Sequence, residues 1–235
     1  QVKDFMKCEA YAMAKINGEW EEEPTPAMMI GSYVDSFFEG TLDEFKEQNP
    51  QIFKKDGTLK SDYIKAEKII ERVSKDELFM KCMSGQKQVI MTGELFGANW
   101  KIKMDSYLPD EAIVDLKCVR KLRDITFKNG WKQSFIETWG YDLQLAVYQE
   151  IVRQNTGKKL PCIIAGVDKQ DIPDLDCILI PEDQLKFQLD QLRCKMPHII
   201  DVKNHNIEPV RCSHCDYCRA TKKLERLISP DELIA

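Results

Sequence analysis

The chain has 235 residues, enough to bury a sizeable core as one domain or as one domain with an appendage. Its hydrophobic fraction of 43% and charged fraction of 31% are typical of globular proteins, and no apolar run approaches the ~20 residues that span a bilayer. The net charge of −5 excludes a uniformly basic nucleic-acid-binding protein, although a nuclease needs basic residues only along its groove.

The N-terminal part is predicted to be helical and to lack a secretory signal. Residues 1–7 have no apolar signal-peptide core, so we expect a cytoplasmic protein without a membrane partner. Residues 2–16 repeat apolar side chains on one helical face, and Asn17-Gly18 ends this helix.

A second helix is predicted for residues 27–39, because Gly40 provides a stop. Asp35 and Glu39 lie one turn apart on one face of this helix. Asp35 is therefore either a candidate metal ligand or an ordinary surface acid.

Residues 42–87 are predicted to form a helical elaboration, with helices at 60–74 and 75–83. No chemistry is indicated there. A strand is predicted for residues 88–94, and its last residue, Glu94, is an acid close to the next hairpin.

Residues 100–118 are predicted to form a β-hairpin, because apolar and charged residues alternate along its first strand and Pro and Asp occupy the turn. A three-residue loop would pair Leu108 with Ala112. The same register places Asp105 opposite Asp115.

Two facing carboxylates repel each other unless a cation lies between them. Opposite side chains have Cβ atoms roughly 4.5–5.5 Å apart, and Mg²⁺ prefers carboxylate oxygens, so Asp105 and Asp115 could share one divalent cation. Lys117 lies two residues beyond Asp115 on the same sheet face, where it could stabilise developing charge or orient water. The alternative is that the three residues are solvated charges on an exposed hairpin.

Basic residues cluster around this hairpin. The basic segment 119–132 is predicted to be a loop near the substrate. Lysine and arginine can contact the phosphates of DNA, and the candidates are Lys101, Lys103, Arg120 and Lys121. A solvated basic face is the alternative.

A long helix is predicted for residues 134–154. One stripe is apolar and faces the core, while another carries Tyr141, Gln144 and Tyr148 at i, i+3 and i+7. The second stripe is either a functional face or a polar flank.

Strands are predicted at residues 160–168 and 175–180, followed by a helix at 181–196. The element order predicts an α/β sandwich with a mixed central sheet. We expect one domain over residues 1–235.

Nine cysteines are unusual as disulfides in a cytosolic protein. Cys212, Cys215 and Cys218 form C-x2-C-x2-C within a Cys-rich segment at 211–226, a spacing typical of zinc and iron–sulfur sites. A fourth ligand is missing locally, and zinc, iron–sulfur and a metal-free thiol cluster all remain open.

In their order, these motifs resemble the PD-(D/E)xK nuclease superfamily. Asp105 and the strand Ile113-Val-Asp-Leu-Lys117 match its D…DxK core. The segments 31–35, GSYVD, and 141–148, YDLQLAVY, match the G-x-x-x-H/D element and the Q-x-x-x-Y helix of its RecB-like and exonuclease VIII (RecE-like) branch, often found in phages. The matches extend over residues 8–220, and the resemblance implies a restriction-endonuclease-like mixed sheet flanked by helices.

The resemblance also implies site roles. Asp105, Asp115 and the carbonyl of Leu116 would hold Mg²⁺ or Mn²⁺, and Lys117 would position the attacking water. Asp35, at a position that is often His in the family, and Glu94, like an extra acid in some relatives, are further metal candidates. Beside the site, the resemblance places Gln144 and Tyr148, with Tyr141 as a DNA contact.

Some RecB-like nucleases carry one Cys before the nuclease core and three after it, which together hold a [4Fe–4S] cluster. By this resemblance Cys8 is the partner of the C-terminal three. The last gap between cysteines is shorter here than in those relatives, so zinc with Cys8 or His214 remains the alternative.

We therefore expect a Mg²⁺-dependent exodeoxyribonuclease that hydrolyses phosphodiester bonds from duplex DNA ends in phage-type recombination. The resemblance implies 5′-to-3′ polarity, a homo-oligomer and a single-strand annealing partner. The alternatives are an endonuclease of the same fold and a non-catalytic DNA-binding module organised by the cysteine site.

Overall fold

A computed structural model describes residues 1–128, 130–224 and 226–233 of the chain. The chain forms two compact units: a larger one, Pro24–Met196, and a smaller one in which Gln1–Glu23 joins Pro197–Ala235. None of the helices in the described ranges combines the length and the apolarity needed to cross a bilayer.

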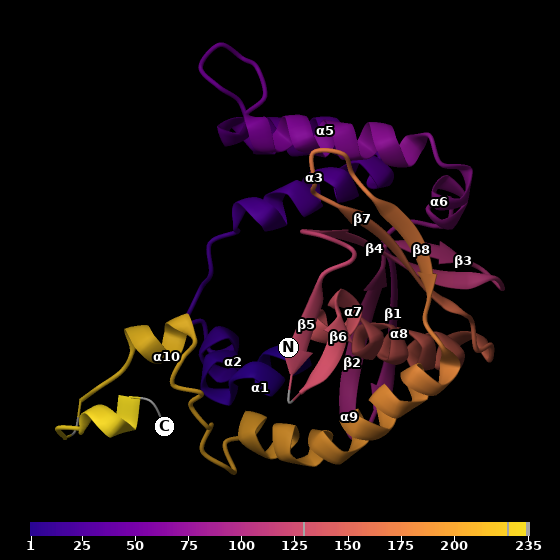
Figure 1. Cartoon of the computed structure of the whole chain (residues 1–235). Coiled ribbons are helices and arrows are strands. Elements are labelled where there is room, and N and C mark those ends of the chain that lie inside the picture. The colour runs from indigo at the N-terminus through magenta and orange to yellow at the C-terminus, as the bar shows by residue number, and fades with distance from the viewer. Residues whose placement is uncertain (129, 225, 234–235) are drawn as a thin grey trace. The chain divides into compact units, whose positions relative to one another are not determined.

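Along the larger unit a run of helices is followed by a run of strands, and then by helices, strands and a last helix (Figure 1). Its helices are α3 (Pro26–Glu39), α4 (Leu42–Gln48), η1 (Pro50–Ile52), α5 (Ser61–Ser74), α6 (Glu77–Cys82), α7 (Phe135–Trp139), α8 (Tyr141–Thr156) and the first part of α9 (Glu182–Lys203). Its strands are β1 (Val89–Leu95), β2 (Ala98–Met104), β3 (Ser106–Leu108), β4 (Ala112–Val119), β5 (Ile125–Lys128), β6 (Trp131–Ser134), β7 (Cys162–Asp168) and β8 (Leu175–Leu179).

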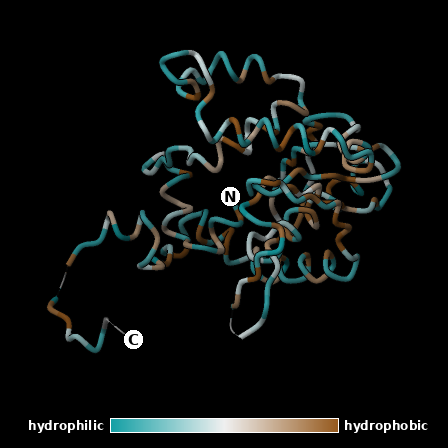
Figure 2. The backbone as a smooth tube through the Cα atoms, turned by 45° about the horizontal axis from the view of Figure 1, so that its top comes forward, coloured by the Kyte–Doolittle hydropathy of each residue, from teal (hydrophilic) through white to brown (hydrophobic). Residues whose placement is uncertain are grey.

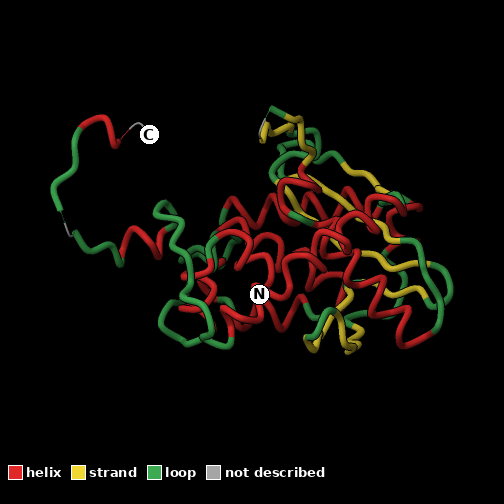
Figure 3. The backbone as a smooth tube through the Cα atoms, turned by 90° about the horizontal axis from the view of Figure 1, so that it is seen from below, coloured by secondary structure: helices red, strands yellow, loops and turns green. Residues whose placement is uncertain are grey.

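A four-stranded mixed sheet lies at the centre of the larger unit. Its order is β3-β4-β7-β8, and Figure 3 shows these strands among the surrounding helices. Strands β4 and β7 are parallel, whereas the outer pairs are antiparallel. The predicted α/β fold with a mixed central sheet is confirmed. Strands β1 with β2 and β5 with β6 form separate antiparallel hairpins.

The two faces of the central strand β4 have different environments. Its residues Val114 and Leu116 belong to the apolar core that α3, α5 and α6 form with the sheet. Because successive side chains of a strand point to opposite faces, Asp115 lies on the other face, where α8 packs against β4. One strand thus supplies both the core and the site.

Four local predictions for the larger unit were wrong. The predicted first strand of the hairpin 100–118 is divided at Asp105 into β2, which pairs with β1, and β3, which pairs with β4. The predicted helix 134–154 is divided between α7 and α8, because Gly140 takes the left-handed conformation (φ 61°) and ends α7. The predicted helix 181–196 continues as far as Lys203 through Pro197, because buried apolar residues extend its inner face beyond the proline. The predicted loop 119–132 contains the β5–β6 hairpin, in which Gly130 takes a positive φ of 80°.

The smaller unit contains α1 (Val2–Lys7), α2 (Glu9–Ile16), the end of α9, α10 (Asp216–Ala220) and η2 (Pro230–Leu233). The predicted single helix 2–16 was wrong, because Cys8 is extended (φ −164°, ψ 114°) and divides it. The N–H of Ala10 donates to the carbonyl of Val210 at 3.1 Å, and the N–H of Val210 donates to Glu9 Oε2 at 2.9 Å. These bonds join the two ends of the chain within this unit.

Candidate active site

The β3–β4 hairpin brings two of the predicted acids together. The register pairs Leu108 with Ala112, as the sequence predicts. Asp105 immediately precedes β3, so the same register places it at the level of Asp115. Its Oδ2 accepts a hydrogen bond from the N–H of Leu116 at 2.9 Å, which fixes the Asp105 carboxylate at the edge of β4.

Asp115 is the most enclosed acid of this group, with 1% of its surface exposed. Its Oδ2 lies 2.5 Å from Lys117 Nζ. Its Oδ1 accepts a hydrogen bond from Gln144 Nε2 at 3.0 Å, and the same nitrogen lies 3.2 Å from Tyr148 Oη. The structure therefore places Gln144 and Tyr148 of α8 beside the acids, although they are about 30 residues away in sequence.

Burial and mutual repulsion change the acidity of the carboxylates. Burial first, and then the charge of Asp115, raise the pKa of Asp105 to about 7 against the opposing effect of Lys117. Burial, together with the charges of Glu39 and Asp115, raises the pKa of Asp35 to about 6. For Lys117, burial works to lower the pKa, but Asp115 and Asp105 raise it above its ordinary value. The lysine is therefore charged at neutral pH.

The donor set suits a hard divalent cation. Three carboxylates, those of Asp35, Asp105 and Asp115, interact electrostatically around Lys117, and a bound cation would relieve their mutual repulsion. The N–H and C=O of one strand residue point to the same edge of the strand. Because the Leu116 N–H donates to Asp105, the Leu116 carbonyl also points to the Asp105 side, just before the start of β3. Oxygen ligands of this kind are those that Mg²⁺ and Mn²⁺ prefer.

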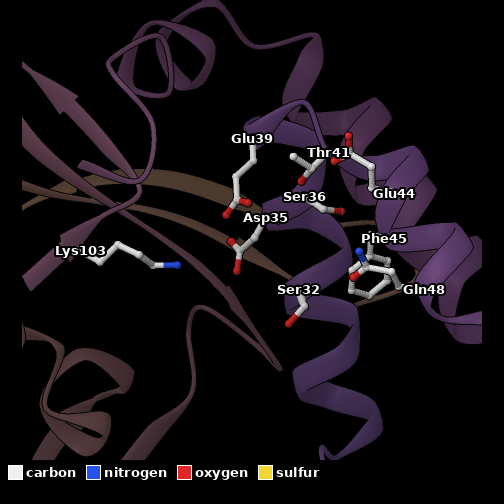
Figure 4. Close-up of a pocket in the computed structure, with 9 residues that line it drawn as sticks. All are labelled: Ser32, Asp35, Ser36, Glu39, Thr41, Glu44, Phe45, Gln48 and Lys103. Atoms are coloured by element: carbon white, nitrogen blue, oxygen red, sulfur yellow. The ribbon is translucent and has the colours of Figure 1, made fainter. Parts of the chain in front are cut away.

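A hollow of about 300 Å³ adjoins Asp35. Figure 4 shows the carboxylates of Asp35 and Glu39 on the side of α3 that faces the Lys103 amine. Lys103 of β2 therefore reaches the acidic group, and its charge, like that of Lys117, opposes the rise in the pKa of Asp35. Lys101 points from the same strand face into a different hollow, which it shares with Glu94.

The structure does not bring Glu94 to the other acids. Glu94 is exposed and pairs with Asn99 in the β1–β2 hairpin. Six residues separate Asn99 from Asp105, which at 3.3 Å per residue is about 20 Å along the strand. Glu94 was a candidate metal ligand because it is close in sequence to the hairpin. The β1–β2 register places it far from Asp105, so Glu94 is not among the proposed metal ligands.

The remaining DNA-contact candidates lie around a cavity next to Lys117. The ring of Tyr141 lies 5.0 Å from Lys117 Nζ, a cation–π contact. Arg120 and Lys121 line a cavity that Tyr141 also lines. Arg120 forms an ion pair with Asp124 at 2.5 Å, so Lys121 carries the less constrained charge.

Two residues near the acids were not among the predicted site residues. Glu39 lies one turn beyond Asp35, a spacing that could have identified it. Lys87 interacts with Asp105, which raises the lysine's pKa, but burial has the larger effect and the net shift is downward. Nothing in the sequence around Lys87 indicates that this lysine lies near Asp105, because their proximity depends on the tertiary fold.

The four predicted cysteines meet within the smaller unit. Their sulfur atoms all lie within 4.8 Å of one another. The Sγ atoms of Cys8 and Cys218 are 3.5 Å apart, and those of Cys212 and Cys218 are 4.0 Å apart. Backbone N–H groups point at the sulfurs: that of Cys215 lies 3.3 Å from Cys212 Sγ and that of Cys218 lies 3.4 Å from Cys215 Sγ. This pattern suits thiolates that bind a metal. Cys8, 204 residues before Cys212, is the fourth member, and His214 is not in the group.

A mixed sheet that carries facing acids and a lysine in the D…DxK order is the architecture of the PD-(D/E)xK nuclease superfamily. Residues 1–221 match a family described as a PDDEXK-like domain of unknown function (DUF3799), and the chain belongs to this family. A solved structure from Eubacterium rectale, described as a putative exonuclease, is 54% identical, covers 97% of this chain and 86% of its own, and superposes with a TM-score of 0.93. Among curated proteins, none matches the sequence. The fold and these comparisons support nuclease activity on DNA.

Proposed function

We propose that the protein is a Mg²⁺-dependent exodeoxyribonuclease that hydrolyses phosphodiester bonds from duplex DNA ends. The observation that carries the proposal is the convergence of Asp105, Asp115 and Lys117 at the edge of β4, with Gln144 bonded to Asp115. The similarity to a structure described as an exonuclease supports cleavage from ends. Phage-type recombination, 5′-to-3′ polarity, an annealing partner and a homo-oligomer belong to the proposal and rest on the sequence resemblance alone.

In this proposal each residue has a defined task. The carboxylates of Asp105, Asp115 and Asp35 and the carbonyl of Leu116 would hold Mg²⁺ or Mn²⁺. Such an ion supplies a Lewis acid that neutralises charge on the phosphate and lowers the pKa of water. The Lys117 ammonium, kept charged by Asp115 and Asp105, orients the attacking water and stabilises the negative charge that develops on the phosphate oxygens.

Neighbouring residues hold these groups in position. Gln144 donates to Asp115 Oδ1 and is itself in contact with the hydroxyl of Tyr148, so Oδ1 is oriented while Oδ2 faces Lys117. Tyr141 lies against the Lys117 amine and limits its rotamers. This preorganisation lowers the reorganisation that the site undergoes during reaction.

A single comparison tests the proposal. Blunt linear duplex and covalently closed circular DNA are incubated with Mg²⁺ and with EDTA, and the products are sized. We expect linear DNA to be degraded to nucleotides or short products only with Mg²⁺, while circles stay intact. Steady nicking of closed circles would favour the endonuclease alternative, and metal-independent binding without cleavage would favour the DNA-binding module.

For the cysteine site we propose a structural zinc ion held by Cys8, Cys212, Cys215 and Cys218. Metal–sulfur bonds of about 2.3 Å in a tetrahedron give sulfur–sulfur edges of about 3.8 Å, close to the separations of 3.5 and 4.0 Å. Thiolates that bind four different irons of a [4Fe–4S] cluster lie further apart. Colourless protein with one zinc per chain is expected, whereas brown protein that absorbs near ~400 nm would identify the iron–sulfur alternative.

A further inference from the structure

The cavity beside Lys117 is larger and more apolar than the acidic hollow. It has a volume of about 590 Å³, within the range of about 300–1,000 Å³ that holds small ligands. Tyr141, whose ring contacts Lys117, forms one wall, and Phe135 lies edge-on to Tyr141 with 6.2 Å between ring centroids. Trp139 and Met28 add apolar surface. The aromatic walls offer a stacking surface for a nucleobase.

The same cavity has basic groups for a phosphate. Lys121, Arg120 and Lys169 all line it. Arg120 is held by Asp124, and Lys169 Nζ donates to the carbonyl of Ala27 at 2.9 Å. In the described part of the chain, Lys121 forms no ion pair, and its side chain is exposed. An apolar base site with basic groups beside it is the combination by which proteins bind single-stranded nucleic acid.

The β5–β6 hairpin extends the cavity outward. Thr126 lines the cavity and its Oγ1 is 2.5 Å from Thr138 Oγ1 of α7, which ties the hairpin to this wall. Lys128 follows Thr126 on the same strand face, and the register places Trp131 directly opposite Lys128. Trp131 is 77% exposed. An aromatic ring and an ammonium group therefore stand together on the face that continues the cavity.

The figures agree on the character of this hairpin. Figure 3 shows it standing out beyond the neighbouring helices, and Figure 2 shows hydrophobic and hydrophilic stretches side by side along it. Phe127 is 70% exposed but lies on the opposite hairpin face, paired with Lys132. The two faces thus offer a matched pair of aromatic residues, one beside the cavity and one away from it.

We propose that the cavity and the outer hairpin face bind an unpaired DNA strand, with one nucleotide in the cavity next to Lys117 and a neighbouring base stacked on Trp131. The proposal deepens the proposed nuclease function by naming the substrate as DNA with a single-stranded end. A blunt duplex would have to fray before its terminal nucleotide could enter. Negative phosphates complement Lys121 and Lys128, which favours a nucleic-acid occupant over a second copy of this acidic chain.

Binding in EDTA tests this without cleavage. Fluorescence anisotropy compares a duplex that has a four-nucleotide overhang at one end with the same duplex ending blunt, both labelled at the opposite end. We expect Trp131→Ala to weaken binding of the overhang about tenfold, because one stacked base contributes on that scale, and Phe127→Ala to change it less than twofold. Lys121→Ala should weaken binding and reduce its salt dependence by about one phosphate contact. Binding of the blunt duplex should change little.

Several outcomes would overturn the proposal. Equal effects of Trp131→Ala and Phe127→Ala, or no effect of either, would remove the stacking face. A change from oligomer to monomer in Trp131→Ala, with DNA binding unaltered, would assign the hairpin to self-association. Mg²⁺-dependent cleavage of linear DNA tests the nuclease function separately. Failure of the strand-binding proposal would therefore leave the nuclease proposal intact, and the reverse also holds.

Discussion

The charge of Asp105 should destabilise the metal-free protein while serving the proposed metal site. Its pKa rises from 3.8 to about 7 on folding. One pKa unit corresponds to about 1.4 kcal/mol, which sets an upper limit of about 4 kcal/mol for the cost of ionised Asp105. Relaxation of the protein and entry of water reduce such costs, so we expect ionised Asp105 to destabilise the folded protein by about 2 kcal/mol. Because the folded pKa is raised, this cost is absent below pH 4, grows as the pH rises to 7, and is complete above it.

The substitution Asp105→Asn removes this charge. Asparagine keeps an oxygen that can accept the hydrogen bond from the Leu116 N–H, but it carries no charge. At pH 8 in EDTA we expect the variant to be more stable than the parent by about 2 kcal/mol, which raises the Tm by about 4–8 °C for a chain of this size. At pH 4.5 the gain should be much smaller. Mg²⁺-dependent cleavage should be lost.

Thermal unfolding followed by circular dichroism at both pH values measures the effect. Asp190→Asn, an exposed residue on α9, is the matched control and should shift the Tm by about 1 °C or less. Mg²⁺ at pH 8 should raise the Tm of the parent and leave that of Asp105→Asn unchanged. A variant that is less stable than the parent at pH 8, or equally shifted at both pH values, would refute the reasoning.

Three further predictions concern catalysis and the cysteine site. Asp115→Asn should lower Mg²⁺-dependent cleavage by orders of magnitude with DNA binding retained; activity within about threefold of the parent would remove Asp115 from the mechanism. Lys117→Ala should lower turnover, while calorimetry finds Mg²⁺ affinity kept or raised, because removing the ammonium leaves more negative charge; joint loss of both would contradict its role. Cys8→Ser and Cys215→Ser should each destabilise by on the order of 4 kcal/mol, with a double mutant little worse than either. Additive effects, or an equal effect of exposed Cys194→Ser, would argue against a shared metal.

Local sequence patterns were enough to predict the β-hairpin that carries Asp105 and Asp115. Alternating side chains and the turn chemistry after Leu108 were sufficient to predict its pairing with Ala112, and hence the facing of Asp105 and Asp115. These contacts lie within a few residues of one another, so short-range geometry decides them. Predictions failed where one residue adopts a conformation that periodicity does not encode, as at Cys8 and Gly140.

The packed fold determines which distant residues meet and what charge they carry. For Gln144 and Cys8 the family resemblance had already indicated the neighbours, but local sequence patterns had not. The contact of Gln144 with Asp115, and that of Cys8 with the C-terminal cysteines, join segments that no local pattern links. The exclusion of Glu94 follows from the β1–β2 register. The raised pKa of Asp105 results from desolvation and from the charges gathered around it. Burial is a property of packed elements and not of spacing along the chain, which is why the sequence could name the acids but not their protonation.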